Sequence, residues 1–103
     1  MISRIWHGWT KAGPDADTYD AMLRSHILPG IYRVAGFRGA YLLRRDAGAE
    51  VEFVTITMFH DLAAVKQFAG SDYTRAVIHP DAAKLLTRYD ERSAHYEATL
   101  VSS

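Results

Sequence analysis

The amino-acid sequence predicts an α+β domain in which a four-stranded antiparallel sheet carries its helices on one face. Strand-like segments rich in β-branched and aromatic residues alternate with segments of helical periodicity. Two of the strand-like segments are joined by only three residues, so they pair locally as a hairpin. The 103 residues are 49% hydrophobic, which is enough for one core. We therefore expect a single domain over residues 1–103.

The first part of the chain predicts a strand followed by a long helix. Residues 2–10 contain isoleucine, tryptophan and threonine and end at a Lys-Ala-Gly-Pro turn, as is typical of a strand. A helix is expected from Pro14 to Leu28, since proline suits a first helical turn. Its apolar stripe comprises Tyr19, Met22, Leu23, His26 and Ile27. Pro29 predicts an end or a kink there, because proline lacks an amide hydrogen, and Ile31 and Val34 indicate that another helical turn follows.

The middle of the chain predicts a hairpin and a second helix. Residues 36–46 and 50–59 are the two expected strands, separated by the turn-like residues 47–49. Asp61 is suited to cap the helix that follows, and Gly70 is suited to end it. Its buried stripe would comprise Leu62, Val65, Phe68 and Ala69.

The last part of the chain predicts a short third helix and a closing strand. The helix follows Pro80, and its apolar face would comprise Ala82, Leu85, Leu86 and Tyr89. Residues 92–101 are the expected fourth strand. The resulting order, β-α-β-β-α-(α)-β, is the ferredoxin-like arrangement.

The third predicted strand is apolar on both faces. Val51, Phe53 and Phe59 share one parity, whereas Val54, Ile56 and Met58 share the other. One helix layer covers only one face of a sheet, and a monomer rarely leaves such a patch in water. We therefore expect a homodimer in which a second copy covers the other face, forming an α+β barrel.

Composition excludes several classes of partner and site. The chain has twelve basic and twelve acidic residues, so net charge favours neither nucleic acid nor an anionic membrane. Cysteine is absent, which excludes disulfides and thiolate metal sites. The beginning of the sequence has no signal-peptide pattern, and no apolar run reaches the roughly 18 residues of a membrane span. We expect a cytoplasmic protein.

Several segments together resemble a known family. The Gly-Phe-Arg-Gly-Ala segment at residues 36–40, the segment over residues 53–68 and the closing His-Tyr-Glu at residues 95–97 are similar to those of antibiotic biosynthesis monooxygenase domains. The resemblance covers nearly the whole chain. It implies a dimeric α+β barrel that either oxidises polycyclic aromatic substrates without metal or flavin, or degrades haem. Many members have no established reaction.

The haem-degrading branch of this family is not well matched. The resemblance implies a tryptophan on the second helix and an iron-binding histidine just after it, and these positions fall on Phe68 and Ile78. His79 is one residue away, and one residue on a helix rotates a side chain by about 100°. Strand one also lacks the asparagine found in those enzymes. Haem binding or degradation is thus the least favoured alternative.

Histidine and aromatic residues supply the candidate site. His26 lies on the apolar stripe of the first helix and is the candidate general base, although a buried core histidine is the alternative. Candidate ligand-binding residues are Trp9, Phe68, Tyr73 and His7. If the face of strand one that carries Trp9 meets the helices, Trp9 is placed to stack on a ligand; a core role is the alternative. The five histidines share no metal-binding spacing, so no metal is expected.

Together these observations predict a cofactor-independent monooxygenase that acts on a small aromatic or polycyclic substrate. The alternative is a dimeric barrel that binds a small apolar ligand and catalyses no reaction. No cofactor, nucleic acid or membrane partner is expected.

Overall fold

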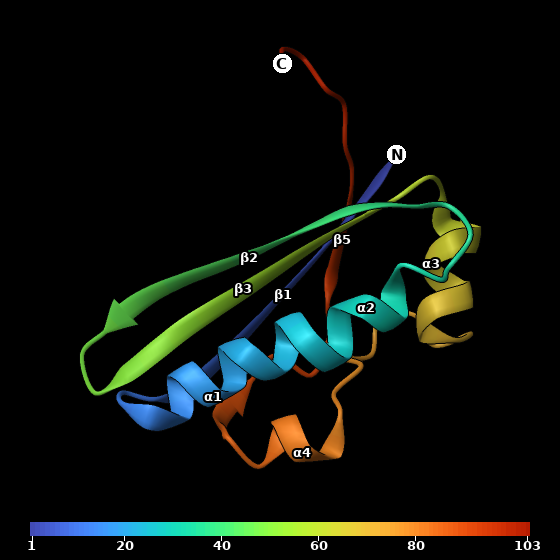
Figure 1. Cartoon of the computed structure of the whole chain (residues 1–103). Coiled ribbons are helices and arrows are strands. Elements are labelled where there is room, and N and C mark those ends of the chain that lie inside the picture. Colours follow the sequence, from blue (N-terminus) through green and yellow to red (C-terminus); the bar gives the residue numbers. More distant parts are fainter.

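The computed structural model describes the backbone of residues 1–103 and the side chains of residues 1–25 and 30–103. Its antiparallel sheet has the order β2 (Phe37–Ala47), β3 (Glu50–Phe59), β1 (Ile2–Lys11) and β4 (Leu86–Tyr89), and β5 (Ala94–Glu97) also pairs with β1. The helices lie on one face of this sheet (Figure 1). The predicted ferredoxin-like α+β class is confirmed.

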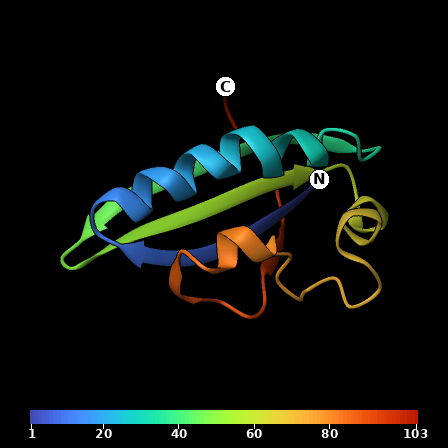
Figure 2. The ribbon, with the colours of Figure 1, turned by 60° about the horizontal axis from the view of Figure 1, so that its bottom comes forward.

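The first helix extends past Leu28, and the further turn that Ile31 and Val34 indicated is present as far as Ile31. It comprises α1 (Pro14–Met22), a π-helical turn η1 (Leu23–Ile27) and α2 (Leu28–Ile31), which run across the sheet as one continuous element (Figure 2). A π-turn is a common way to bend a helix without ending it. The proline at position 29 lies in α2, after the π-helical turn, and the helix does not end there. No helix in the described chain is long and apolar enough to cross a membrane.

The second predicted helix is confirmed with both of its end signals. α3 (Leu62–Ala69) begins after Asp61, whose carboxylate accepts a hydrogen bond from the amide of Ala64 at 2.9 Å. It ends at Gly70, whose φ of 87° is a left-handed conformation that glycine adopts without strain.

The third predicted helix is too long, and the sheet has five strands where four were expected. α4 (Pro80–Ala83) ends before Leu86, and residues 86–89 form β4. A register shift opposite Trp9 and Thr10 leaves Thr87 outside the regular pairing. In a regular strand, residues three apart point to opposite faces, whereas in a helix they share a face. The irregularity places both Leu86 and Tyr89 on the helix-covered face, which explains why their spacing suggested a helix.

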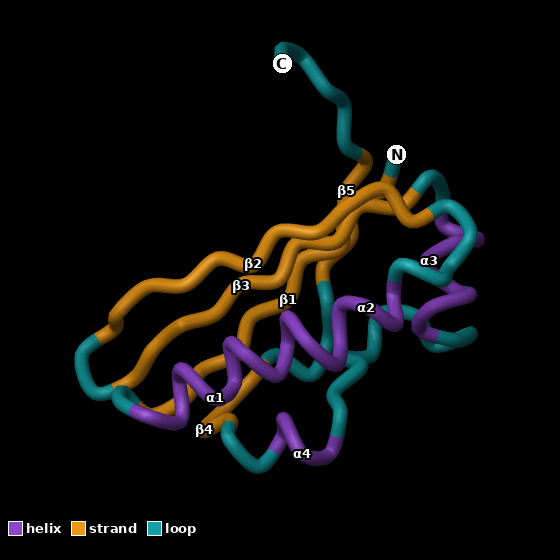
Figure 3. The backbone as a smooth tube through the Cα atoms, in the orientation of Figure 1, coloured by secondary structure: helices purple, strands orange, loops and turns teal.

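The predicted closing strand is also shorter than expected. β5 pairs with residues 2–5 of β1, and β4 pairs with residues 8–10 of the same edge. Two short strands thus share the fourth strand position of the ferredoxin-like order. Residues 98–103 extend away from the helix-covered side of the sheet (Figure 3).

The core fills the space between the helices and the sheet. Its first cluster contains Tyr19, Leu23, Val51, Phe53 and Ala82, together with Ala16. The second cluster contains Ile31, Phe59, Ala64 and Val65. The predicted parity of β3 is therefore confirmed, because its helix-facing phenylalanines are fully buried.

The opposite side of the sheet carries no helix. We call this side the open face; it presents Ile5, His7, Trp9, Tyr41, Leu43, Val54, Ile56, Met58 and Tyr96. Tyr41 is 68% exposed and Leu43 is 44% exposed. The strands therefore bury one set of apolar side chains and leave the other set in contact with solvent.

Candidate functional site

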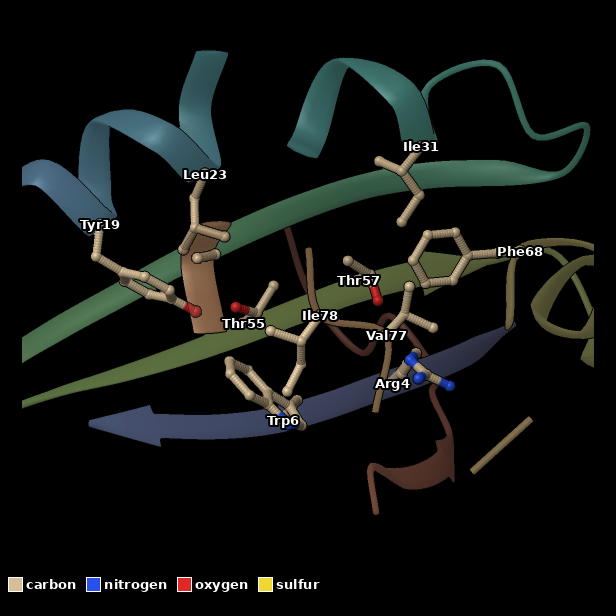
Figure 4. Close-up of a pocket in the computed structure, with 11 residues that line it drawn as sticks. Arg4, Trp6, Tyr19, Leu23, Ile31, Thr55, Thr57, Phe68, Val77 and Ile78 are labelled. Carbon is tan, nitrogen blue, oxygen red and sulfur yellow. The ribbon is translucent and has the colours of Figure 1, made fainter. Parts of the chain in front are cut away.

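A cavity of about 70 Å³ lies between the helix layer and the sheet (Figure 4). Its aromatic lining comprises Trp6, Tyr19 and Phe68, and its aliphatic lining comprises Leu23, Ile31, Val77, Ile78 and Ala82. Polar groups come from Arg4, Thr55 and Thr57. Its composition, apolar with few polar groups, is that of a small-molecule site, and its volume is below the roughly 300–1,000 Å³ of sites that hold drug-sized ligands.

The cavity arises where β3 changes from large to small side chains. Phe53 and Phe59 fill the two core clusters, and Thr55 and Thr57 lie between them on the same face. Threonine is smaller than phenylalanine and adds a hydroxyl group. The pattern Phe-x-Thr-x-Thr-x-Phe is the sequence signal for this cavity, and it lies outside the predicted site, which consists of histidine and aromatic residues.

Trp6 is held in place by the residue after β4 and by a glycine on its own strand. Its indole Nε1 donates a hydrogen bond to the carbonyl oxygen of Asp90 at 2.7 Å. Its ring covers Gly8, where a Cβ atom would lie 2.6 Å from Cη2 of the indole. The glycine therefore provides the space in which the tryptophan forms one wall of the cavity.

Replacing Gly8 with alanine is expected to displace the Trp6 ring and to destabilise the fold by roughly 1–3 kcal/mol, the range for overpacking. The indole is rigid, and Leu86 approaches the same position at 3.2 Å, so the clash is not relieved by a small rotation. Urea denaturation and tryptophan fluorescence measure both effects. Gly30→Ala is the matched control, because no atom of the described residues lies within 4 Å of its added Cβ. A Gly8→Ala variant with wild-type stability and fluorescence would contradict this packing.

Arg4 is the charged group of the cavity. Its side chain donates hydrogen bonds to the backbone carbonyls of Tyr73 and Arg75, the latter at 2.9 Å. A third contact joins Nη1 to Nε2 of His95 at 3.1 Å. Burial lowers the pKa of Arg4 to about 10, so the guanidinium remains a cation at neutral pH.

Two further titratable groups near the cavity are kept uncharged at neutral pH. Burial raises the pKa of Tyr19, so its phenol keeps its proton. Burial and, secondarily, the charge of Arg4 lower the pKa of His95. Because its Nε2 faces a donor, His95 acts as an acceptor towards Arg4. The charge of the described cavity lining is therefore that of Arg4.

The structure brings only some of the expected ligand-binding residues to this cavity. Phe68 lines it, whereas Tyr73 contributes its carbonyl to Arg4 and packs its ring against His95. Trp9 and His7 lie on the open face, since the helices cover the opposite side of β1. The condition for Trp9 to meet a ligand beside the first helix is thus not met. Arg4 and Trp6, which sequence reasoning did not select, occupy that position instead.

The two open-face residues have other contacts. The guanidinium carbon of Arg88 lies 4.0 Å from the ring centre of Trp9. The Nδ1 atom of His7 lies 3.8 Å from a carboxylate oxygen of Glu52. The side chain of His26 lies outside the described residues. Among the described residues, no group of three or more histidine or acidic side chains is arranged to hold a metal ion.

No family model matches the chain, and no curated protein matches it. Solved structures do match. SnoaB, a cofactor-independent oxygenase from Streptomyces nogalater, is 19% identical with a TM-score of 0.64, over 98% of both chains. The haem degrader MhuD from Mycobacterium tuberculosis, solved with two haems in its active site, is 17% identical with a TM-score of 0.66, over 100% of both chains.

A third similar structure is a Bacillus cereus protein whose proposed identity is an antibiotic biosynthesis monooxygenase. It is 16% identical with a TM-score of 0.62, and the match covers 99% of this chain and 94% of that one. Similarity at these identities establishes the fold and leaves the reaction open. The chain therefore has the fold of the antibiotic biosynthesis monooxygenase-type proteins, as its sequence predicts.

Proposed function

We propose that the cavity binds a small aromatic molecule and that the chain acts on it as a cofactor-independent monooxygenase. The observation that supports this most directly is the cavity itself, where Trp6 and Phe68 offer aromatic surfaces and Thr55 and Thr57 offer hydroxyl groups. Aromatic side chains stack on flat ligands, and hydroxyl groups fix their orientation. SnoaB, a cofactor-independent oxygenase with a similar fold, supports the same reaction class.

The proposed reaction begins with removal of a proton from an acidic carbon of the substrate. The resulting carbanion supplies electrons to dioxygen, and a carbon–oxygen bond forms. When the oxygen–oxygen bond breaks, a CH₂ group and O₂ have become C=O and H₂O. The substrate is the reductant, so the protein has to supply only a base and a closed site.

We assign the base to His26. It lies on η1, between Leu23 and Ile31, and both of these residues line the cavity. Among the described lining residues, Arg4 is a cation and Tyr19 keeps its proton, so neither accepts a proton near neutral pH. Imidazole is the side chain whose ordinary pKa suits this task.

His26→Ala is expected to lower turnover by about 100-fold or more, the usual contribution of a general base, while ligand binding stays within about twofold of wild type. Oxygen uptake with anthrone, an acidic aromatic ketone, measures turnover. The matched control is His60→Ala, because His60 is exposed and lies outside the cavity lining. Unchanged turnover in His26→Ala would remove the histidine from the mechanism. Binding without oxygen uptake in the wild type would favour the non-catalytic ligand-binding alternative.

The cavity lining does not fit a haem ligated at the position that the family resemblance indicates. Ile78 stands there and lines the cavity. The neighbouring His79 is exposed, and its Nδ1 accepts the amide hydrogen of Asp81 at 3.1 Å, capping α4. This histidine is engaged away from the cavity. We therefore propose no haem chemistry for this chain.

We further propose that the functional unit is a homodimer joined through the open face. That face groups apolar side chains from β1, β2 and β3 in one surface, and Tyr96 of β5 extends it with a side chain that is 57% exposed. A two-fold axis covers the same surface on both copies at once. The C-terminal tail over residues 98–103 leaves this side of the sheet (Figure 1), and Leu100 and Val101 within it are exposed.

A further inference from the structure

Arg4 is a buried cation for which the described chain supplies no carboxylate. Its side chain is almost fully buried, with only 4% of the residue exposed. The hydrogen-bond partners of its guanidinium are two backbone carbonyls and the neutral ring of His95. A buried charge without a counter-charge is costly and is rarely retained for packing alone.

The ion pairs of the described chain do not involve Arg4. The ion pairs of the described side chains place Asp17 and Asp20 on Arg44, Glu50 on Arg88, and Asp72 on Arg92. None of these pairs includes Arg4, and residues 26–29 contain no acidic side chain. The positive charge of Arg4 is therefore not neutralised within the chain.

The guanidinium also has hydrogen-bonding capacity left. It carries five N–H donors, and the contacts with Tyr73, Arg75 and His95 engage three of them. Arg4 lines the cavity, and its guanidinium lies 5.6 Å from the ring centre of Phe68, another lining residue. A cation with two donors that no described residue engages thus borders a site whose other walls are largely apolar and aromatic.

We propose that the ligand of this cavity is an aromatic anion whose ionised oxygen, as a carboxylate or an enolate, is bound by the guanidinium of Arg4. This inference rests on the proposed ligand-binding role of the cavity and names the class of ligand. Arginine binds such oxygens through two parallel hydrogen bonds, and exclusion of water strengthens the attraction. In the proposed oxygenase reaction the same contact stabilises the enolate form of the deprotonated substrate.

The test compares two ligands that share a ring and differ in charge, benzoate and benzamide. Binding is followed by NMR through the indole N–H signals, of which that of Trp6 reports on the cavity and that of Trp9 on the open face. The Trp9→Phe variant identifies the two signals. We expect the Trp6 signal to shift with both ligands and benzoate to bind about tenfold more tightly, as a charge-assisted hydrogen bond provides.

Two variants separate anion binding from a structural role for Arg4. Arg4→Met keeps the length of the side chain without its charge, and we expect it to bind benzamide as the wild type does and benzoate about tenfold more weakly. Arg4→Lys keeps the charge but lacks the two-pronged guanidinium, and we expect it to prefer benzoate less strongly than the wild type does. This variant tests the assignment even if Arg4→Met does not fold. The thermal unfolding temperature of each variant shows whether loss of the hydrogen bonds to residues 73 and 75 destabilises the fold.

Each outcome bears on a different claim. Equal affinities of the wild type for benzoate and benzamide would overturn the anion assignment and leave the aromatic-ligand proposal standing. Equal weakening of both ligands in a folded Arg4→Met variant would show that Arg4 only holds the cavity together, and would also overturn the assignment. If neither ligand shifts the Trp6 signal of the wild type, the proposed function fails, and the assignment fails with it.

Discussion

Replacing Phe53 with alanine is expected to lower the free energy of unfolding by about 3–5 kcal/mol. Phe53 has no exposed surface, and its ring packs edge-on against Tyr19 with 4.9 Å between the ring centres. Its face also receives the guanidinium of Arg44 at 5.5 Å. Since small domains are stable by only about 5–15 kcal/mol, this substitution removes a large part of the total.

Urea denaturation followed by circular dichroism measures this loss. Phe53→Leu is the matched control, because leucine retains most of the apolar volume; it is expected to cost less than about 1.5 kcal/mol. A cost below 1 kcal/mol for Phe53→Ala would mean that Phe53 is not in a packed core. The same substitution also enlarges the space beside Thr55, so its effect on ligand affinity is not a separate test of the cavity.

The elements that local sequence determines were predicted with boundaries close to those in the structure. The strand over residues 50–59 agrees with β3, because alternation of apolar residues is a property of the segment itself. The α3 helix has the expected ends, because the Asp61 cap and the Gly70 terminus each act within a few residues. The apolar residues at odd and at even positions of Glu50–Phe59 lie on opposite faces of the strand. This alternation also indicated correctly that one set would be buried under the helices and the other would not.

The parts that depend on long-range register were not predicted. Leu86 and Tyr89 have a spacing that suits a helix, and only the irregular pairing with β1 makes them helix-facing residues of a strand. The face of β1 that meets the helices depends on this pairing too, so the choice between Trp6 and Trp9 was open. Arg4 meets residues 69 to 91 positions further along the chain. No local pattern shows that such an arginine would be buried.

The open face leads to the second large effect, an Ile56→Asp variant that is expected to be monomeric. Ile56 lies in the middle of β3, between Ile5 of β1 and Tyr41 of β2. In a two-fold interface an aspartate at this position is introduced twice, into apolar surroundings and opposite a second copy of the same surface. The cost of burying a charge without a partner is several kcal/mol per ion, so we expect the dimer dissociation constant to rise by at least about 100-fold.

Sedimentation at micromolar concentration measures this effect. The wild type is expected at twice the chain mass of 11.6 kDa and Ile56→Asp at 11.6 kDa. Ala63→Asp is the matched control: it adds the same group on the helix side, at an exposed position in the first turn of α3, where the helix dipole favours an acid. It is expected to remain dimeric. A monomeric wild type, or a dimeric Ile56→Asp variant, would show that a second copy does not cover the open face.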